Sequence, residues 1–467
     1  MNAPHPIEAP RAGLHEILRM AAPIIVGSFS FTIMQFVDQW MVSWLGKEAL
    51  AAVGSAGVWS FLLATFFLGV VGCVATFVSQ CLGRGEKQKC AQYAWQGAYL
   101  SVGAGLTALV LFPLSGSLFG WMRHSPEVTR LETIYFQVRL LGFGFIVWQA
   151  ALSSFFQAVS RPRIPMVVAL IANTLNIILD YLLIFGKLGF PKWGIGGAAL
   201  ATVISLIVQC VLLQWIFLSA AYDQEFRSRT AYRLDLVKVR ELLRIGWPSG
   251  LTFFLDMFNW AIFTSYLVGR SGDAALAAHS AAINYMHVSF MPVVGLNHAV
   301  APIVGQWIGR GRVETAKART YTAMKLAIAY MFTMGLGMAT FAPQLLRVFS
   351  SDPEVLRVGR IILILAATFQ AFDAVNIVTM GALRGAGDTR FMMWAFLGAG
   401  YAFFLPLAYV LAVSLKWGAI GAWVGATCYI IGLSGVLFLR FYTEGWRHVQ
   451  IFERDSLEPS ELPETES

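Results

Sequence analysis

Residues 164–185 read IPMVVALIANTLNIILDYLLIF, an apolar run that only a few polar side chains interrupt. Asn173, Asn176 and Asp180 are separated by three, four and seven positions, so a helix carries them on one face. A carboxylate in the middle of a bilayer is costly unless it faces water or a partner. The segment therefore predicts a membrane helix with a functional acid. A neutral Asp180 that is hydrogen-bonded in a helix interface is the structural alternative.

The composition of the whole chain agrees with a membrane protein. Of 467 residues, 57% are hydrophobic and 13% are charged, with a mean hydropathy of +0.64. Soluble domains carry roughly 25% charged residues, so this chain has too few charges to cover a soluble surface. Apolar runs of roughly 20 residues recur throughout and favour helices over the alternating pattern of a β-barrel. The first dozen residues show no pattern of a cleaved signal peptide.

The apolar runs predict twelve membrane-spanning helices and their orientation. The expected spans are about 14–45, 49–81, 91–120, 130–159, 163–186, 194–220, 239–268, 274–307, 315–345, 355–383, 389–414 and 418–441. Of the 34 Lys and Arg residues, 22 fall on the side of the two termini and 10 on the opposite side. The positive-inside rule then puts both termini in the cytoplasm.

An internal repeat divides the chain into two halves. Leu50-Ala-Ala and Gln80-Cys-Leu-Gly-Arg-Gly recur 226 residues later as Leu276-Ala-Ala and Gln306-Trp-Ile-Gly-Arg-Gly. Each half has an even number of spans, which predicts two six-helix bundles related by a pseudo-twofold axis along the membrane normal, with a cavity between them. The expected parts are an N-terminal segment (1–13), an N-lobe (14–220), a cytoplasmic linker (221–238), a C-lobe (239–441) and an acidic, disordered tail (442–467).

Four aspartates lie well inside the predicted spans, namely Asp38, Asp180, Asp256 and Asp373. None has an acidic counterpart at the repeat offset, so the scaffold is duplicated but the carboxylates are not. A buried carboxylate can hold a proton, or it can join other oxygen ligands around Na⁺. Either cation would couple the protein to an ion gradient. No comparable cluster of embedded cations exists to bind phosphate, so we expect a cationic or amphipathic cargo.

The chain resembles the multidrug and toxic compound extrusion (MATE) family, in its NorM-like branch. The residues that carry the resemblance are Val37-Asp38, Gln80-x-x-Gly83, Asn176-x-x-x-Asp180-Tyr181 and the run GALRGAGDTR at 381–390. The resemblance implies a cation-coupled antiporter that expels hydrophobic, often cationic drugs by alternating access of two lobes. It implies no cofactor beyond the coupling ion, Na⁺ or H⁺.

The resemblance also implies site residues. The N-lobe cation or proton site would use Asp38, Asn176, Asp180 and Thr202, and the C-lobe candidates are Asp256 and Asp373. Either set could hold Na⁺. Many relatives carry Glu at the position of Asp256 and some carry Tyr at the position of Phe369, which leaves a C-lobe cation site open. The candidate residues of a substrate cavity are Asn173, Phe258, Trp260, Phe369 and Phe372.

Several other functions remain as alternatives or are disfavoured. A lipid-linked saccharide flippase of the same superfamily would need cationic residues in its cavity, and Arg139 is the embedded arginine that the sequence offers. A membrane enzyme lacks support because no hydrolase or metalloprotease motif is present. A net charge of +8 without a basic, aromatic-rich block does not indicate nucleic-acid binding. We expect a multi-pass protein of the bacterial inner membrane that contacts lipids and functions as a monomer.

Overall fold

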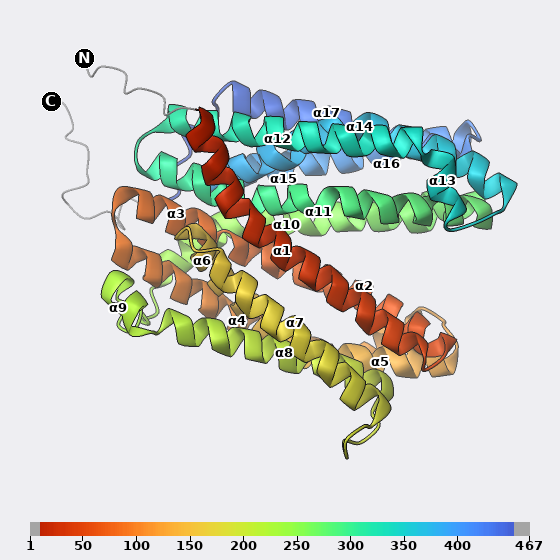
Figure 1. The fold of residues 1–467 in the computed structure, drawn as a ribbon, viewed down its shortest axis with the longest axis horizontal. Helices are drawn as coiled ribbons and strands as arrows, with labels where there is room; N and C mark the ends of the chain where they lie inside the picture. Colours follow the sequence, from red (N-terminus) through yellow and green to blue (C-terminus); the bar gives the residue numbers. More distant parts are fainter. Residues whose placement is uncertain (1–9, 453–467) are drawn as a thin grey trace. The chain divides into compact units, whose positions relative to one another are not determined.

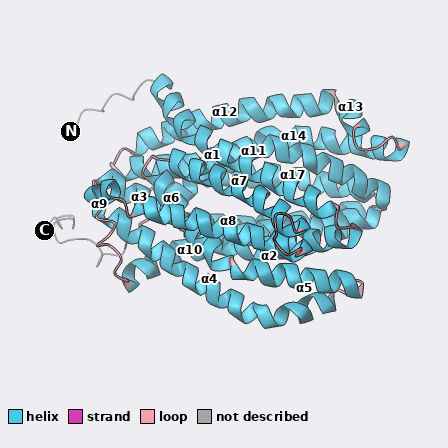
Figure 2. Ribbon diagram, turned by 60° about the horizontal axis from the view of Figure 1, so that its bottom comes forward, coloured by secondary structure: helices cyan, strands magenta, loops and turns pink. Residues whose placement is uncertain are grey.

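The computed structural model describes residues 10–452, with side chains from residue 13 onward. Helices and the loops between them make up this part of the chain, and no strand occurs in it (Figures 1 and 2). The α-helices are α1 (Pro10–Ser43), α2 (Lys47–Gly72), α3 (Val74–Arg84), α4 (Lys87–Trp121), α5 (Pro126–Leu141), α6 (Phe143–Ala158), α7 (Arg163–Phe185), α8 (Gly194–Phe217), α9 (Ala220–Phe226), α10 (Leu236–Ile262), α11 (Asp273–Gly309), α12 (Val313–Thr340), α13 (Ala342–Arg347), α14 (Pro353–Ala386), α15 (Thr389–Leu397), α16 (Leu405–Tyr409) and α17 (Gly418–Tyr442).

The predicted all-helical membrane class is confirmed. Within residues 10–452, eleven helical stretches are long and apolar enough to cross a membrane, and a twelfth forms if the bent pair α5 and α6 counts as one span. The sequence predicted one continuous helix at 130–159, whereas the chain bends there by 46° at Gly142. A Cβ on Gly142 would lie 2.9 Å from Cγ2 of Val203, so glycine allows the bend to pack against α8.

Three helical segments are wound more loosely than an α-helix. They are the π-helical stretches Phe263–Val268, Gly398–Phe404 and Val410–Ser414. The last two flank Pro406, whose missing N–H removes one helical hydrogen bond. The apolar runs predicted ordinary α-helical spans at 239–268 and 389–414. Hydropathy does not distinguish a π-helical turn from an α-helical one.

The chain divides into two compact units. The N-terminal unit comprises residues 26–250 together with residues 450–452, and the C-terminal unit comprises residues 10–25 and 251–449. Helices α1 and α10 therefore contribute to both units. The start of α1 belongs to the C-terminal unit, where Glu16 accepts hydrogen bonds from Arg319 at 2.7 Å and from the indole of Trp307 at 3.1 Å.

The N-terminal unit is built from tightly packed helix pairs. Helix α7 packs along α8, α4 along α6, and α2 along α5. Glycines allow close approach where α2 meets α10, since a Cβ on Gly69 would lie 2.6 Å from the Cα of Gly250. Residues 450–452 also pack into this unit, where Arg244 donates to the carbonyls of Gln450 and Ile451 at 3.0 Å. The rest of the predicted tail, 453–467, lies outside the described residues, as do residues 1–9 of the predicted N-terminal segment.

In the C-terminal unit, helix α14 packs against α11, α12 and α17. Fully buried aromatic side chains fill the space between these helices and the π-helical segments. The largest of them are Trp423, Tyr429, Phe263, Phe369 and Phe404. The core of this unit is thus continuous and strongly aromatic.

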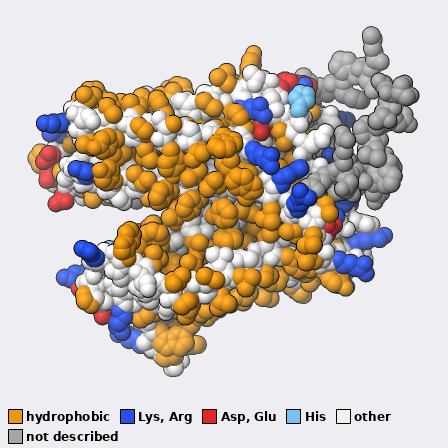
Figure 3. Space-filling view, turned by 180° about the vertical axis from the view of Figure 1, so that it is seen from behind, with side chains coloured by type: hydrophobic (Ala, Val, Ile, Leu, Met, Phe, Trp, Pro, Cys, Tyr) orange, Lys and Arg blue, Asp and Glu red, His pale blue; other side chains and the backbone are white. Residues whose placement is uncertain are grey.

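The surface carries the pattern expected of membrane helices. On the face shown in Figure 3, hydrophobic side chains cover the flanks of the helices, and Lys and Arg gather toward their ends. Leu109 in the middle of α4 is 69% exposed, and Leu141 at the end of α5 is 61% exposed. Such side chains would be costly in water and are suited to lipid.

Candidate functional site

The polar stripe of α7 meets Asp38 of α1 in the N-terminal unit. Asp180 and Asn176 are fully buried, and Asp38 is 9% exposed. The carboxyl groups of Asp38 and Asp180 lie within hydrogen-bonding distance of each other. Two carboxylates in such contact repel each other unless a proton or another cation lies between them. The arrangement can therefore bind positive charge in an otherwise apolar helix bundle.

Asn176 links this acid pair to helix α8. With its amide nitrogen facing Asp38, Asn176 donates to Oδ1 of Asp38 at 2.9 Å, and its oxygen accepts from the backbone N–H of Thr202 at 3.2 Å. The hydroxyl of Thr202 donates to the carbonyl of Ala198 at 3.1 Å. Thr202 thus joins the site through its backbone, while its side chain bonds its own helix.

Asn173 lies one helical turn before Asn176 on the same face. Its amide donates to the hydroxyl of Ser30 in α1 at 2.9 Å. Helices α1 and α7 are therefore connected at two levels, a neutral one at Ser30 and a charged one at Asp38. Sequence spacing predicted the stripe on α7, but it could not identify Ser30, which is one of many serines in apolar segments.

Two further side chains from α5 approach the acid pair. The guanidinium of Arg139 acts electrostatically on Asp38, and the phenol ring of Tyr135 lies near Arg139 and both acids. The positive charge of Arg139 offsets part of the negative charge of the pair. The signal for Arg139 was present in the sequence as an arginine within an apolar span, whereas nothing in the sequence pointed to Tyr135.

One oxygen of the acid pair has no hydrogen-bond partner. Oδ1 of Asp180 is buried and makes no hydrogen bond within residues 10–452. A buried carboxylate oxygen without a donor is unfavourable, and a proton or a hard cation such as Na⁺ would satisfy it. The two carboxyl groups of the pair can bind either occupant.

The two acids of the C-terminal unit are arranged differently. The carboxyl group of Asp256 on α10 accepts a hydrogen bond from the indole of Trp260, one turn along the same helix. Asp373 on α14 accepts from the amide of Asn376 at 3.1 Å. The charges of Asp256 and Asp373 act on each other through space. Each acid thus has a neutral donor of its own.

The aromatic candidates of the C-terminal unit lie in three settings. Phe369 is fully buried and stacks on Trp423, with ring centroids 6.5 Å apart. Phe258 and Phe372, in contrast, are 38% and 44% exposed. Trp260 contacts Phe263 in an edge-on geometry. Phe258, Phe372 and the half-buried Trp260 can contact a molecule from outside the unit, whereas Phe369 is available only for packing.

The C-terminal unit also contains buried polar groups that sequence reasoning missed. The amide of Asn259 on α10 and the hydroxyl of Tyr429 on α17 have no hydrogen-bond partner in the described part of the chain. Tyr429 lies close enough to Asp256 and Asp373 to interact with both electrostatically. A polar residue within an apolar span was the available signal for both residues, as it was for Asn173 and Asn176.

Comparison with known proteins agrees with this architecture. The MatE family model matches residues 23–182 and 248–410, a stretch in each half of the chain. The chain belongs to the MATE family. Its membership, and the likeness to NorM proteins described below, confirm the resemblance that the sequence motifs indicated.

Two NorM relatives and one solved structure show how far the likeness of this MATE protein extends. The multidrug resistance protein NorM of Burkholderia vietnamiensis is 30% identical, and the match covers 91% of this chain and 92% of that protein. A probable multidrug resistance protein NorM of Pseudomonas aeruginosa is 31% identical, with 93% and 90% covered. An outward-facing multidrug resistance MATE transporter of the MOP superfamily has the same fold, with a TM-score of 0.85, 21% identity, and coverage of 96% of this chain and 100% of that one.

Proposed function

We propose that this MATE protein is a cation-coupled multidrug antiporter that exports hydrophobic, often cationic compounds. Its NorM relatives carry the name of multidrug resistance proteins and match nearly the whole chain. The coupling ion would be Na⁺ or H⁺, with no other cofactor. The exposed aromatic rings of Phe258 and Phe372 are suited to stacking on a cationic drug.

The contact between Asp38 and Asp180 is the observation that carries this proposal. A structural acid is expected to have a full set of neutral donors or one opposite charge. This pair has Asn176 and the nearby Arg139 for two carboxyl groups, and one oxygen remains without a donor. Adding one cation satisfies the pair and removing it restores the repulsion, so the free energy of the site depends on cation binding.

Cation binding at this pair would control the conformational cycle. With a cation bound, Asp38 and Asp180 attract the same charge and hold α1 against α7. Without it, their repulsion favours a different arrangement of the two helices. An ion that binds one conformation more tightly shifts the population toward that conformation, which is the requirement for alternating access. Asp256 and Asp373 would contribute negative charge toward a cationic cargo.

The expected membrane arrangement belongs to the same proposal. Both termini would lie in the cytoplasm of a bacterial cell, with the protein acting as a monomer in the inner membrane. The lobes would comprise residues 14–220 and 239–441, joined by a cytoplasmic linker at 221–238. The excess of Lys and Arg on the side of the termini supports this orientation.

Ethidium transport into everted membrane vesicles tests the proposal. Vesicles that contain the protein should accumulate ethidium against its gradient when a Na⁺ gradient or a pH gradient is imposed, and vesicles without the protein should not. Collapse of the driving gradient should stop the uptake. If ethidium only equilibrates, the protein is a passive pathway. If ethidium does not move but a lipid-linked saccharide crosses the bilayer, the flippase alternative is correct.

A further inference from the structure

A pocket opens on the N-terminal unit where α4 and α8 meet the linker. Helix α9 and the loop after it lie at the ends of these two helices (Figure 1). The pocket has a volume of about 630 Å³ and is lined by Trp95, Tyr99, Trp215, Leu218, Ser219, Arg229 and Tyr232. Four aromatic rings and one arginine at the end of membrane helices are typical of a membrane–water interface. On the topology proposed above, this interface is the cytoplasmic one.

Hydrogen bonds from α4 hold the wall of this interfacial pocket in place. The indole of Trp95 donates to the carbonyl of Ser228 at 2.8 Å, and the hydroxyl of Tyr99 donates to the carbonyl of Tyr232. Both acceptors belong to the loop after α9. The loop is therefore fixed over α4, and the pocket exists without a ligand to shape it.

The guanidinium of Arg229 is held in place by one hydrogen bond, and its two terminal nitrogens remain available to a ligand. Nε of Arg229 donates to the carbonyl of Leu218 at 2.8 Å and lies 4.0 Å from Asp223. The backbone N–H of Arg229 donates to Asp223 at 2.9 Å. The two terminal nitrogens make no hydrogen bond with a described residue, and the side chain is 56% exposed. Their N–H groups can donate hydrogen bonds to a phosphate oxygen.

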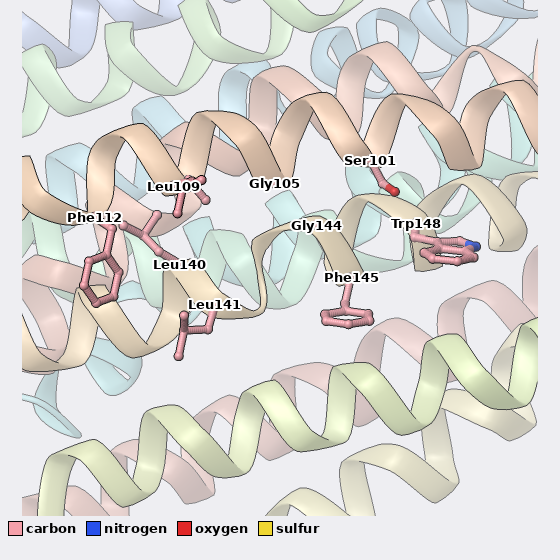
Figure 4. Close-up of a pocket in the computed structure, with 10 residues that line it drawn as sticks. Ser101, Gly105, Leu109, Phe112, Leu140, Leu141, Gly144, Phe145 and Trp148 are labelled. Carbon is pink, nitrogen blue, oxygen red and sulfur yellow. The ribbon is translucent and has the colours of Figure 1, made fainter.

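An apolar groove lies deeper along the same helix (Figure 4). It has a volume of about 310 Å³ and runs between α4 and the bend of α5 and α6. Trp148 lies at one end of this groove. Its indole donates to the side chain of Gln214 at 3.1 Å, and the next residue, Trp215, lines the interfacial pocket. The groove lies along α4 from Ser101 to Phe112. At a rise of 1.5 Å per residue, this stretch begins about 3 Å from Tyr99 along the helix axis and ends about 20 Å from it. An acyl chain in one leaflet spans about 15 Å.

We propose that the interfacial pocket and the groove together bind one anionic glycerophospholipid of the cytoplasmic leaflet. The headgroup phosphate contacts Arg229, the aromatic rings surround the glycerol region, and one acyl chain follows the groove past Trp148. The positive charge selects an anionic headgroup over a zwitterionic one. The adjoining apolar groove favours a lipid over free phosphate, because phosphate alone would leave the groove unfilled.

Native mass spectrometry of the full-length protein in detergent tests this site with defined lipids. The protein is titrated with phosphatidylglycerol, with phosphatidylcholine, and with inorganic phosphate, and the bound fractions give dissociation constants. We expect tighter binding of phosphatidylglycerol than of phosphatidylcholine. Arg229→Gln should weaken phosphatidylglycerol binding about fivefold. It should weaken phosphatidylcholine binding by a smaller factor, because both lipids carry the phosphate but only phosphatidylglycerol has a net negative charge.

Arg233→Gln is the matched control, since Arg233 carries the same charge in the same loop and is exposed, but does not line the pocket. It should keep wild-type affinity. Trp215→Leu is a second test that does not depend on Arg229, because Trp215 is 73% exposed and makes no hydrogen bond within the described residues. It should weaken binding of both lipids by a similar factor.

Three results would overturn the proposal. Equal effects of Arg229→Gln and Arg233→Gln would mean a general attraction to the basic surface. Equal affinity of the wild-type protein for the two lipids would exclude selection by charge. Full competition by inorganic phosphate would show that the site recognises the anion without its acyl chains. None of these results bears on ethidium transport, so the lipid site and the proposed export function are tested separately.

Discussion

The two pairs of intramembrane acids differ in what surrounds them. In the N-terminal unit, Asp38 and Asp180 contact each other, and Arg139 acts electrostatically on Asp38. In the C-terminal unit, Asp256 bonds Trp260 and Asp373 bonds Asn376, and no hydrogen bond joins the two acids in the described structure. A repeated scaffold therefore carries two chemically distinct carboxylate pairs.

This difference indicates how the work of the transporter is divided. The N-terminal pair is incomplete without a proton or cation, since one of its oxygens has no donor. The C-terminal acids each have a neutral donor that stabilises a negative charge. We therefore expect ion coupling at the N-terminal pair and attraction of cationic cargo at the C-terminal acids.

The largest effect is expected from neutralising the N-terminal pair. Asp180→Asn or Asp38→Asn should reduce ethidium export to the background of cells without the protein, because one carboxylate cannot create the repulsion that a cation relieves. Membrane insertion should be preserved, since an amide costs less to bury than a charge. Efflux from cells with matched expression measures this. Normal export by either variant would eliminate the pair as the coupling site.

A smaller effect is expected when the pair keeps both acids but loses its amide. Asn176→Ala removes the hydrogen bond that stabilises the Asp38 carboxylate and should tighten cation binding about tenfold, because bonds to charged groups contribute about 1.5–3 kcal/mol. The ion concentration that gives half-maximal export is the quantity to measure. Asn173→Ala is the control, since Asn173 is buried on the same helix face but bonds the neutral Ser30. Similar shifts for both variants would show a general disturbance of α7.

Neutralising an acid of the C-terminal unit should change the export of cationic cargo and leave the dependence of export on the ion gradient intact. Asp373→Asn should lower the rate of export of cationic dyes by about tenfold or less, through the loss of one negative charge near the cargo. Export of an uncharged hydrophobic substrate should change less. The measurement compares the export rates of a cationic dye and an uncharged substrate in the same vesicles. Loss of the response to the ion gradient would instead assign coupling to both pairs.

The smallest effect on export is expected for an acid that belongs to neither pair. Asp388 lies in the short loop between α14 and α15, between the predicted spans 355–383 and 389–414. It is buried there and accepts a hydrogen bond from Arg440 at 2.8 Å. Asp388→Asn should keep near-normal export and destabilise the protein by about 1 kcal/mol, because the amide oxygen can still accept from Arg440. A thermal unfolding assay measures this. A larger loss of export than with Asp373→Asn would place the coupling outside the membrane pairs.

Hydropathy was sufficient to predict the fold class and the number of spans. An apolar run of about 20 residues has few alternatives to a membrane helix. The bend at Gly142 and the π-helical turns around Pro406 escaped prediction, because they depend on packing against α8 and α17 rather than on local composition. The two closely spaced glycines in Leu141-Gly142-Phe143-Gly144 were the available sign of the bend.

The candidate site was predicted in part. Spacing placed Asn173, Asn176 and Asp180 on one helix face, but only the family resemblance connected them with Asp38 of a distant span. The contributions of Tyr135, Asn259 and Tyr429 depend on which helices become neighbours, and a single sequence does not contain that information. The roles of all these residues in transport remain predictions for the experiments above.

The most direct test of the central claim is ethidium uptake by everted vesicles under an imposed Na⁺ gradient and then an imposed pH gradient, with wild-type protein and Asp180→Asn in parallel. One of the two gradients should drive uphill uptake by the wild-type protein. Neither gradient should drive uptake by the variant, although the purified variant should still bind ethidium. Gradient-driven accumulation of ethidium by Asp180→Asn would contradict ion coupling at the N-terminal pair.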